Sequence, residues 1–380
     1  MTSGGSGAHR RAYIDVARGV AVLLMIEAHT TDAWTRAASK HTVAFRDATI
    51  LGGFAAPMFL WLAGVAVVLA AGRAEARTGS RAAAVDGICR RGLEIFILAF
   101  LFRLQAFIVS PGGHPVTIFR VDILNVMGPA IALAAVIWGC VATNAARVWL
   151  FSSATTIVAM ASPIVRAAPW VDRLPTWLQW YVRPAGDYTT FTLFPWMAFV
   201  FAGGAVGAVV ASARDARAES RVQAWLALAG AALVALGFVT AARPSIYAAS
   251  SFWTSSPTWF AIRLGVMMVA LAGLYATVRL THVAPRAAPF ARLGRSSLFI
   301  YWIHVELVYG YASWLWRGRL PLWGTALAFA TFSTLMYGVL VLRDRLTGGL
   351  DESPRVRPSA GRRWYWRWRR PVRHARADVG

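Results

Sequence analysis

Charged side chains are scarce in this sequence. They make up 15% of its 380 residues, whereas hydrophobic residues make up 57%. Soluble domains contain about 25% charged and about 45–50% apolar residues. The composition therefore excludes an ordinary soluble protein and predicts a protein of the membrane class.

Lysine and cysteine are nearly absent. Lys40 is the only lysine, and Cys89 and Cys140 are the only cysteines. The two cysteines have neither a metal-ligand spacing nor the pattern of a disulfide framework, so we expect no metal centre. Abundant Ala, Arg and Gly in place of lysine are typical of a GC-rich bacterial genome.

Before the C-terminal tail, long polar stretches are missing as well, because apolar runs follow one another along the chain. A membrane span needs about 20 mostly apolar residues. Ten segments qualify: 13–31, 50–72, 92–110, 122–142, 147–166, 193–213, 222–242, 258–278, 295–315 and 321–342. We therefore predict an all-α integral membrane protein, a bundle of about ten transmembrane helices with no sizeable soluble domain.

Positive charge predicts the orientation, since cytoplasmic loops carry more Lys and Arg than external ones. With the N-terminus inside, the inner connections hold fifteen basic residues and the outer ones ten, and the chain from Arg343 onward adds eleven. Both termini are therefore predicted to be cytoplasmic, in a bacterial cytoplasmic membrane. The predicted parts are a flexible N-terminus (1–12), a membrane domain (13–345) and an Arg/Trp-rich tail (346–380).

The tail alternates arginine with aromatic residues in RRWYWRWRR (362–370). Such a segment favours binding to anionic lipid, with the rings among the headgroups. The alternative is an unstructured tail that only sets the topology. The net charge of +22 does not indicate a nucleic-acid partner, because the arginines lie between apolar segments.

The first predicted span is the richest in ionisable residues, with Asp15, Arg18, Glu27 and His29. Such residues are costly inside a bilayer and usually face a cavity, so each is a functional candidate. Eleven residues separate Arg18 from His29. This spacing puts both within about 20° of one helix face and about 16 Å apart along it. Asp15, three residues before Arg18, is placed to orient its guanidinium.

Five segments in order resemble a known family. The run IDVARGVAVLLMIEAH (14–29) has the Arg, ten residues, His pattern of the transmembrane acyltransferases. The others are PMFLWLAGVAVVLA (57–70), FRVDILNVMG (119–128), LFPWMAFVFAGGAVG (193–207) and SSLFIYWIHVELVYG (296–310). Together they resemble the catalytic domain of heparan-alpha-glucosaminide N-acetyltransferase and its bacterial relatives.

The resemblance implies an enzyme that transfers an acyl group from cytoplasmic acetyl-CoA, or another acyl-CoA, to a sugar or glycan-like acceptor on the other side. Arg18 would then hold a phosphate of the donor, because a guanidinium makes bidentate bonds with phosphate. His29 would meet the thioester, either as a general base or as a nucleophile that forms an acyl-enzyme.

The identity of the base has two alternatives. In the eukaryotic N-acetyltransferases the position that matches His29 is an asparagine, and the essential histidine lies further along the chain. That region here holds Lys40 and His41. The base is therefore either His29 or His41, and we favour His29. Asp32, three residues after His29, is placed to orient its imidazole.

Polar residues near the last spans and in the fourth span are further candidates. Ser297, Tyr301 and His304 share one helix face. They either line the acceptor cavity, or His304 makes an interhelical hydrogen bond. Arg120 and Asp122 lie at the outer mouth of the fourth span, where they either bind substrate or form a structural ion pair.

Three further arginines have open roles. Arg91 either pairs with Glu94 or joins the donor phosphate site. Arg103 and Arg263 lie within predicted spans and have no partner nearby in the sequence, so they either face a cavity or extend to the membrane surface.

A transporter or exporter of a polar or anionic solute is the alternative function, since it would use the same intramembrane charges. It predicts Gly/Pro-broken helices at corresponding positions of two halves, and the sequence has no such symmetry. We therefore predict a membrane acyltransferase. The acceptor, the acyl chain length and the oligomeric state, with a homodimer as one possibility, are left open.

Overall fold

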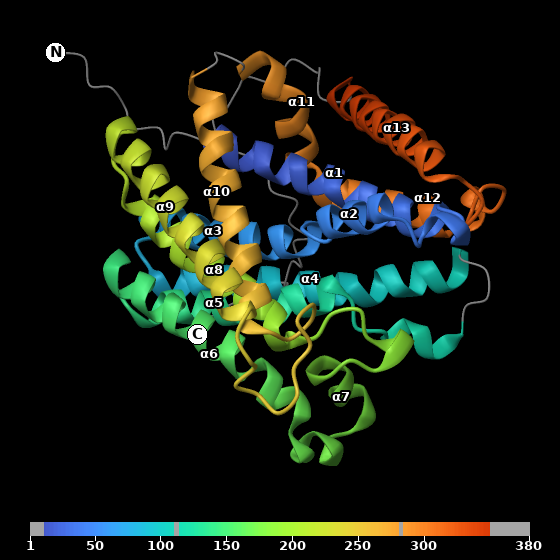
Figure 1. The fold of residues 1–380 in the computed structure, drawn as a ribbon. Helices are drawn as coiled ribbons and strands as arrows, with labels where there is room; N and C mark the ends of the chain where they lie inside the picture. Colours follow the sequence, from blue (N-terminus) through green and yellow to red (C-terminus); the bar gives the residue numbers. More distant parts are fainter. Residues whose placement is uncertain (1–10, 110–113, 281–283, 350–380) are drawn as a thin grey trace, which may run out of the picture. The chain divides into compact units, whose positions relative to one another are not determined.

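The computed structural model describes residues 11–109, 114–280 and 284–349. Within these residues the regular structure is helical, apart from isolated bridges between Thr35 and Leu320 and between Val121 and Thr189 (Figure 1). The α-helices are α1 (Ala12–Trp34), α2 (Val43–Gly52), α3 (Ala55–Thr78), α4 (Arg81–Val109), α5 (Ile123–Cys140), α6 (Asn144–Ala167), α7 (Thr176–Val182), α8 (Leu193–Ser212), α9 (Ala216–Ala241), α10 (Pro257–Leu280), α11 (Ala284–Arg295), α12 (Ser297–Tyr309) and α13 (Leu322–Gly349).

The chain divides into two compact units, residues 1–340 and residues 341–380. The helices that form the candidate site belong to the first unit. Of the second unit the structure describes only 341–349, the last turns of α13. The boundary predicted at 345 therefore falls inside a helix. The RRWYWRWRR segment and residues 1–10 of the predicted N-terminus lie outside the described residues.

Among the described residues, eight helical segments are long and apolar enough to cross a membrane: Val43–Thr78, Arg81–Val109, Ile123–Cys140, Asn144–Ala167, Leu193–Ser212, Ala216–Ala241, Pro257–Arg279 and Leu322–Thr347. They correspond to eight of the ten predicted spans. The other two are α1, whose 23 residues include four charged side chains, and α12, which has only 13 residues. A helix of that length extends about 20 Å, less than the ~30 Å of a hydrocarbon core.

The predicted span 295–315 is wrong at both ends. α11 ends at Arg295, and Ser296 leaves the helical conformation with ψ 20° before α12 begins. α12 ends after Tyr309, because Gly310 is extended with ψ −171°. α11 packs on α1 so closely that a Cβ on Gly19 would lie 2.0 Å from the carbonyl oxygen of Phe290. The α11–α12 segment is thus a broken helix, and α11 packs against α1.

The corner between α2 and α3 also contacts α1. A Cβ on Gly52 would lie 2.3 Å from Oε2 of Glu27, so glycine lets the chain cross α1 at this level. Arg263 of α10 donates a hydrogen bond to the carbonyl oxygen of Gly53. Its guanidinium lies 4.8 Å from the ring centre of Phe54 and 4.7 Å from that of Trp259. Arg263, which had no partner in the sequence, therefore holds this corner in place.

Glycines allow the long helices to touch along their backbones. A Cβ on Gly64 of α3 would lie 1.9 Å from the carbonyl oxygen of Val200 on α8. A Cβ on Gly265 of α10 would lie 2.4 Å from the carbonyl oxygen of Gly230 on α9, and Figure 1 shows α9 and α10 side by side. Small residues at helix contacts are typical of membrane proteins. In lipid the hydrophobic effect does not drive helices together, so their association depends on close packing.

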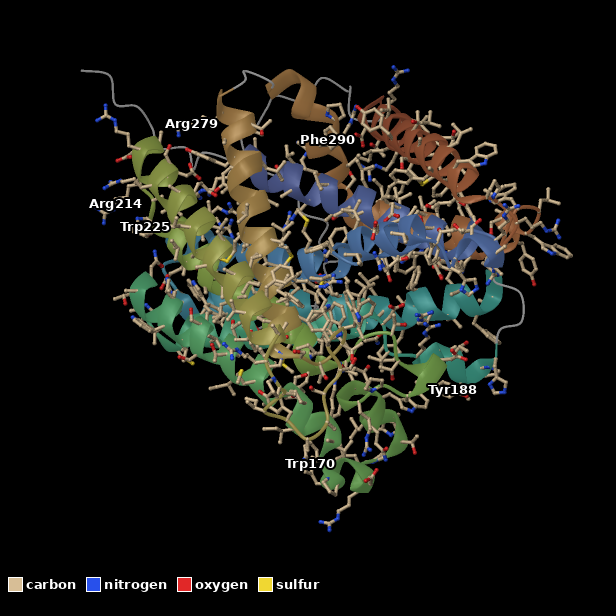
Figure 2. The ribbon with its side chains drawn as sticks, viewed as in Figure 1. Trp170, Tyr188, Arg214, Trp225, Arg279 and Phe290 are labelled. Atoms are coloured by element: carbon tan, nitrogen blue, oxygen red, sulfur yellow. The ribbon has the colours of Figure 1, made fainter. Side chains whose placement is uncertain are left out.

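The outward face of α9 is apolar. Trp225 and Leu228 are 69% and 63% exposed, and Figure 2 shows Trp225 at the outer side of this helix. Trp61, Trp138 and Phe199, in contrast, are fully buried between helices. Continuous apolar surface of this kind is unfavourable in water and suits contact with lipid tails. With the eight spans, it identifies a multi-pass membrane protein.

Arg279 and Trp170 lie at opposite ends of the long helices (Figure 2). Arg279 at the end of α10 donates to the carbonyl oxygen of Ala216 at the start of α9, with an N–O distance of 2.9 Å. Trp170 lies in a short 3₁₀-helix, Pro169–Arg173, that follows α6. Figure 2 shows Arg214 and Arg279 at one end and Trp170 at the other.

Candidate functional site

One cavity of about 980 Å³ collects most of the predicted site residues. Seven of the ten line it: Arg18, His29, Asp32, Arg91, Arg120, Asp122 and Tyr301. Asp15, His41 and His304 do not belong to its lining. Its walls come from α1, α3, α4, α5 and the α11–α12 segment, so the fold brings distant parts of the chain into one site.

α1 places Arg18 and His29 at two levels of this cavity. Both side chains line it, as their spacing predicted. The helix rises about 16 Å between them. The wall between the two levels is mostly apolar and includes Met25, Phe59, Leu62, Ile95 and Phe102. An apolar passage therefore joins a cationic level to an imidazole level.

α4 repeats this separation along another wall of the cavity. Arg91 and Arg103 both line the cavity, twelve residues apart. Twelve residues of helix rise about 18 Å, close to the distance between the two levels on α1. Nη1 of Arg91 lies 2.9 Å from Oε2 of Glu94, which confirms the predicted local pair. Arg91 therefore pairs with Glu94 and also lines the cavity, while its part in a donor phosphate site stays a prediction.

A third arginine, Arg295, lines the cavity near Arg18. Its neighbour Gly294 approaches α1 so closely that a Cβ there would lie 2.9 Å from Cβ of Arg18 and 2.0 Å from the carbonyl oxygen of Asp15. Asp15 itself is buried and outside the lining. Arg18, Arg91 and Arg295 therefore form a cationic end, which we call the arginine end.

At the other level, Asp122 binds Arg103 rather than Arg120. The Asp122 carboxylate and the Arg103 guanidinium form an ion pair, and each side chain is 15% exposed. The same carboxylate accepts a hydrogen bond from the backbone N–H of Ile123 at 2.9 Å and begins α5. Arg103 therefore has an ion-pair partner, although the sequence suggested none. Asp122 forms a structural ion pair, as one of its two alternatives predicted, but with Arg103 in place of Arg120.

The connection between α6 and α8 closes this level of the cavity. The N–H of Thr190 donates to the carbonyl oxygen of Val121 at 3.0 Å. Arg120 donates to the hydroxyl oxygen of Thr190 through Nε at 3.2 Å and Nη2 at 2.7 Å. Asn125 donates to the phenol oxygen of Tyr181 at 3.4 Å. Burial raises the pKa of Tyr181, and the hydrogen bond from Asn125 opposes that rise.

His29 is hydrogen-bonded to His304 of α12. Nδ1 of His29 lies 2.9 Å from Nε2 of His304, and Nδ1 of His304 lies 2.8 Å from the carbonyl oxygen of Ile300. His304 is completely buried. Of the two alternatives for His304, the interhelical hydrogen bond is therefore correct, while Tyr301 one turn earlier lines the cavity.

Asp32 does not orient His29, contrary to the prediction. Its Oδ2 accepts a hydrogen bond from the phenol of Tyr309 at 2.9 Å. Its Oδ1 lies 3.7 Å from Nζ of Lys40, which also donates to the Asp32 backbone carbonyl at 2.7 Å. The i+3 spacing put Asp32 near the right level, but the partner of His29 comes from another helix. Asp32 and Tyr309 line the cavity beside His29 instead.

His41 is exposed and lies in the connection between the 3₁₀-helix Ala37–Ser39 and α2, outside the cavity lining. The arginine end and His29 share one cavity, whereas His41 does not open into it. The geometry therefore favours His29 as the base, and the variants proposed in the Discussion test the choice.

Four ionisable residues of the cavity lining were missed from the sequence: Arg295, Glu306, Tyr309 and Arg317. Glu306 is 8% exposed, and neither carboxylate oxygen has a hydrogen-bond partner among the described residues. An acidic residue within the apolar run of α12 was a signal that could have identified it. Among the same residues, no three His, Cys, Asp or Glu side chains come together as a metal site would require.

Residues 10–238 match the family described as heparan-alpha-glucosaminide N-acetyltransferase, catalytic. The chain belongs to this family. The match covers more than half of the chain, from α1 into α9, and includes the cavity residues from Arg18 to Asp122. A member of the heparan-alpha-glucosaminide N-acetyltransferase family with eight apolar spans is a multi-pass membrane acetyltransferase. No curated protein matches the chain.

Proposed function

We propose that this protein transfers an acetyl or other acyl group from cytoplasmic acyl-CoA to a sugar or glycan-like acceptor on the far side of the membrane. The observation that carries the proposal is the single cavity with the arginine end at one level and His29 at the other. A donor anchored by its phosphates at the first level presents its thioester at the second. The family membership supports acetyl as the group transferred.

The arginine end suits the phosphates of the donor. Arg18, Arg91 and Arg295 come from three different helical segments and all line the cavity. Guanidinium groups bind phosphate with paired, charge-assisted hydrogen bonds. The apolar wall between the levels suits the pantetheine arm, whose length is comparable to the rise of about 16 Å from Arg18 to His29. The volume of about 980 Å³ is at the upper end for small-molecule sites, which leaves room for an acceptor.

His29 acts as the general base in this proposal. The acceptor hydroxyl or amine gives its proton to the imidazole as its oxygen or nitrogen bonds to the thioester carbonyl carbon. The carbon–sulfur bond then breaks, and the departing thiolate takes the proton from the imidazolium. A base in this position contributes roughly 10²–10⁴ in rate. Attack by the imidazole itself is the alternative, and an acetylated His29 trapped after rapid quenching would support that route.

The acceptor enters beside His29, where polar side chains gather. Arg120, Tyr301, Tyr309 and Arg317 line this level, together with the paired Asp122. Phenols and guanidinium groups bind the hydroxyl groups of a sugar by hydrogen bonds and present flat surfaces to its ring. The residues of this level support a polar acceptor, in keeping with the family description.

The membrane orientation belongs to the same proposal. We place the arginine end and both termini on the cytoplasmic side of a bacterial inner membrane, because basic residues concentrate in the connections on that side. His29 then faces the outer side, where the acceptor is. The tail, whose sequence favours anionic lipid, follows the last span on the cytoplasmic side.

The test uses the purified full chain in lipid nanodiscs with acetyl-CoA labelled in its acetyl group. Acetyl transfer to an amino sugar or a simple glycoside, or slow hydrolysis without an acceptor, is the expected result. If acetyl-CoA stays intact with every sugar tried, while proteoliposomes of the same protein move a polar solute unchanged, the transferase proposal is replaced by the transporter.

A further inference from the structure

The two histidine rings meet edge to edge between α1 and α12. Their planes differ by 4°, and their centres are 5.1 Å apart. The distance of 2.9 Å between Nδ1 of His29 and Nε2 of His304 is shorter than the contact of about 3.5 Å between stacked rings. The nitrogens therefore face each other nearly in the ring planes, which is the geometry of a directed hydrogen bond.

The backbone of α12 determines which nitrogens carry protons. The carbonyl oxygen of Ile300 can only accept, so Nδ1 of His304 carries a hydrogen atom. In a neutral imidazole the other nitrogen then has none, and Nε2 of His304 accepts from His29. Nδ1 of His29 is consequently the donor, and its Nε2 keeps a free lone pair. Within the described residues that Nε2 has no hydrogen-bond partner, and His29 faces the cavity.

No other group competes for this role among the described residues. Asp32 and Asp122 are the carboxylates that act electrostatically on His29, but Asp32 is bonded to Tyr309 and Asp122 to Arg103. Tyr309 contacts the His29 ring with its edge, at 5.6 Å between centres. Among the residues that the structure describes, only His304 is hydrogen-bonded to Nδ1 of His29.

We propose that His304 is a positioning residue that holds His29 in the tautomer with a proton on Nδ1 and the basic lone pair on Nε2. This inference rests on the proposed function, in which His29 accepts the acceptor's proton. His304 touches no substrate, because it is completely buried behind His29 and does not line the cavity. Its chain of bonds runs from the Ile300 carbonyl through both rings to the reacting nitrogen.

The tautomer matters because the two nitrogens of His29 are not equivalent. If the proton moved to Nε2, the nitrogen that faces the cavity would be a donor and could not take up a proton. Orienting partners of catalytic histidines fix the ring and its tautomer in this way. In a well-studied hydrolase triad, loss of the correct tautomer lowers kcat by about 10⁴ with the geometry otherwise intact.

The test compares two substitutions in the full-length protein. His304→Phe keeps a planar ring of similar size but offers no acceptor, and His304→Gln offers a side-chain carbonyl oxygen to the Nδ1–H of His29. We expect His304→Phe to lower kcat by roughly 10²–10⁴ while KM for acetyl-CoA stays within about threefold. The kcat of His304→Gln is expected to be at least about tenfold higher than that of His304→Phe, because the glutamine restores a hydrogen-bond acceptor for Nδ1–H of His29. Thermal unfolding and acetyl-CoA binding are measured for both.

Each outcome decides the proposal. Full activity of His304→Phe overturns it, and so does equal loss in both variants when both fold and bind acetyl-CoA, since ring packing would then be the requirement. If His304→Phe does not fold, the Gln variant decides alone: activity within about tenfold of wild type supports the role, and activity as low as that of His29→Ala overturns it. A wild type without acyl transfer shows instead that the proposed function fails. An active His29→Ala shows that His29 is not the base, and either result removes the role of His304.

Discussion

Asp122 joins two helices through one carboxylate. It pairs with Arg103 near the end of α4, and it accepts the N–H of Ile123 at the first turn of α5. The side chain of Asn125 in turn accepts the backbone N–H of Asp122 at 3.0 Å, which completes a capping box. The wall of the cavity beside His29 therefore depends on an ion pair and a helix cap that share a residue.

Substitution of Asp122 should separate these two roles. Asp122→Asn keeps a side chain that caps helices well. It removes the carboxylate charge, however, so the mostly buried Arg103 guanidinium loses its ion-pair partner. Breaking such a pair costs about 3–5 kcal/mol, and Asp122→Ala should cost roughly 1 kcal/mol more because the cap is lost as well. Thermal unfolding of all three proteins in the same detergent measures their stability, which should fall from wild type to Asp122→Asn to Asp122→Ala.

The matched control for this pair is a double variant. The double variant Arg103→Met with Asp122→Asn removes both charges of this pair. It should therefore be more stable than Asp122→Asn alone, which leaves the Arg103 charge without its partner. If Asp122→Asn unfolds at the wild-type temperature, the ion pair contributes nothing to stability and the wall is held by packing.

Relations within one helix could be predicted from the sequence. Arg18 and His29 share a face of α1 because the period of 3.6 residues is a local property of the chain. The eight long apolar segments were found for a similar reason, since composition over about 20 residues decides whether a helix suits a bilayer. The span 295–315 was predicted too long, because the apolar pattern continues past Gly310 although helix α12 does not.

Relations between helices could not be predicted in this way. His29 and His304 are 275 residues apart, and the nearer Asp32 was the natural candidate for the same bond. Arg103 had no visible partner, because Asp122 lies on the next helix and only the packing of α4 on α5 brings them together. A single sequence offers no signal for such pairs, whereas paired substitutions in an alignment would.

The arginine end should control donor affinity. Arg18→Ala should weaken acetyl-CoA binding about ten- to a hundredfold, because it removes charge-assisted hydrogen bonds of ~1.5–3 kcal/mol to a phosphate. Arg295→Ala should act in the same direction, and both losses should shrink at high salt. Isothermal titration of the protein in nanodiscs measures the affinity.

A matched control for the donor site is Arg214→Ala. Arg214 is exposed and does not line the cavity. Its replacement by alanine removes one positive charge from the chain, as Arg18→Ala does. Equal weakening by Arg214→Ala and Arg18→Ala would mean that net charge, not a local phosphate site, attracts the donor.

Two exposed alanines can test the membrane orientation. Ala249 lies in the connection between α9 and α10, and Ala76 lies in the last turns of α3. In a chain whose Cys89 and Cys140 are replaced by serine, Ala249→Cys should react with a membrane-impermeant maleimide in intact cells, and Ala76→Cys should react only after lysis. Ala76 is preferred to Gly79, whose φ of 68° a cysteine would strain. The reverse pattern would invert the proposed direction of transfer.

The choice between His29 and His41 is tested by removing each imidazole in turn. His29→Ala should reduce acyl transfer by roughly 10²–10⁴ while acetyl-CoA binding stays within a few-fold, because a base is lost and the phosphate contacts remain. His41→Ala should keep nearly full turnover, since His41 is exposed and outside the cavity. Single-turnover rates with labelled acetyl-CoA, measured beside binding, separate chemistry from affinity.

Two further results would change the assignment in different ways. If His41→Ala is inactive and His29→Ala is not, the base lies in the connection before α2, as in the eukaryotic members, and the cavity residues at the level of His29 serve to hold the acyl group. If both variants keep full turnover, neither imidazole takes the proton. Glu306 is then the next candidate, because its carboxylate lines the same cavity and has no hydrogen-bond partner among the described residues. Glu306→Gln would decide that case, since the amide keeps the shape of the side chain but cannot act as a base.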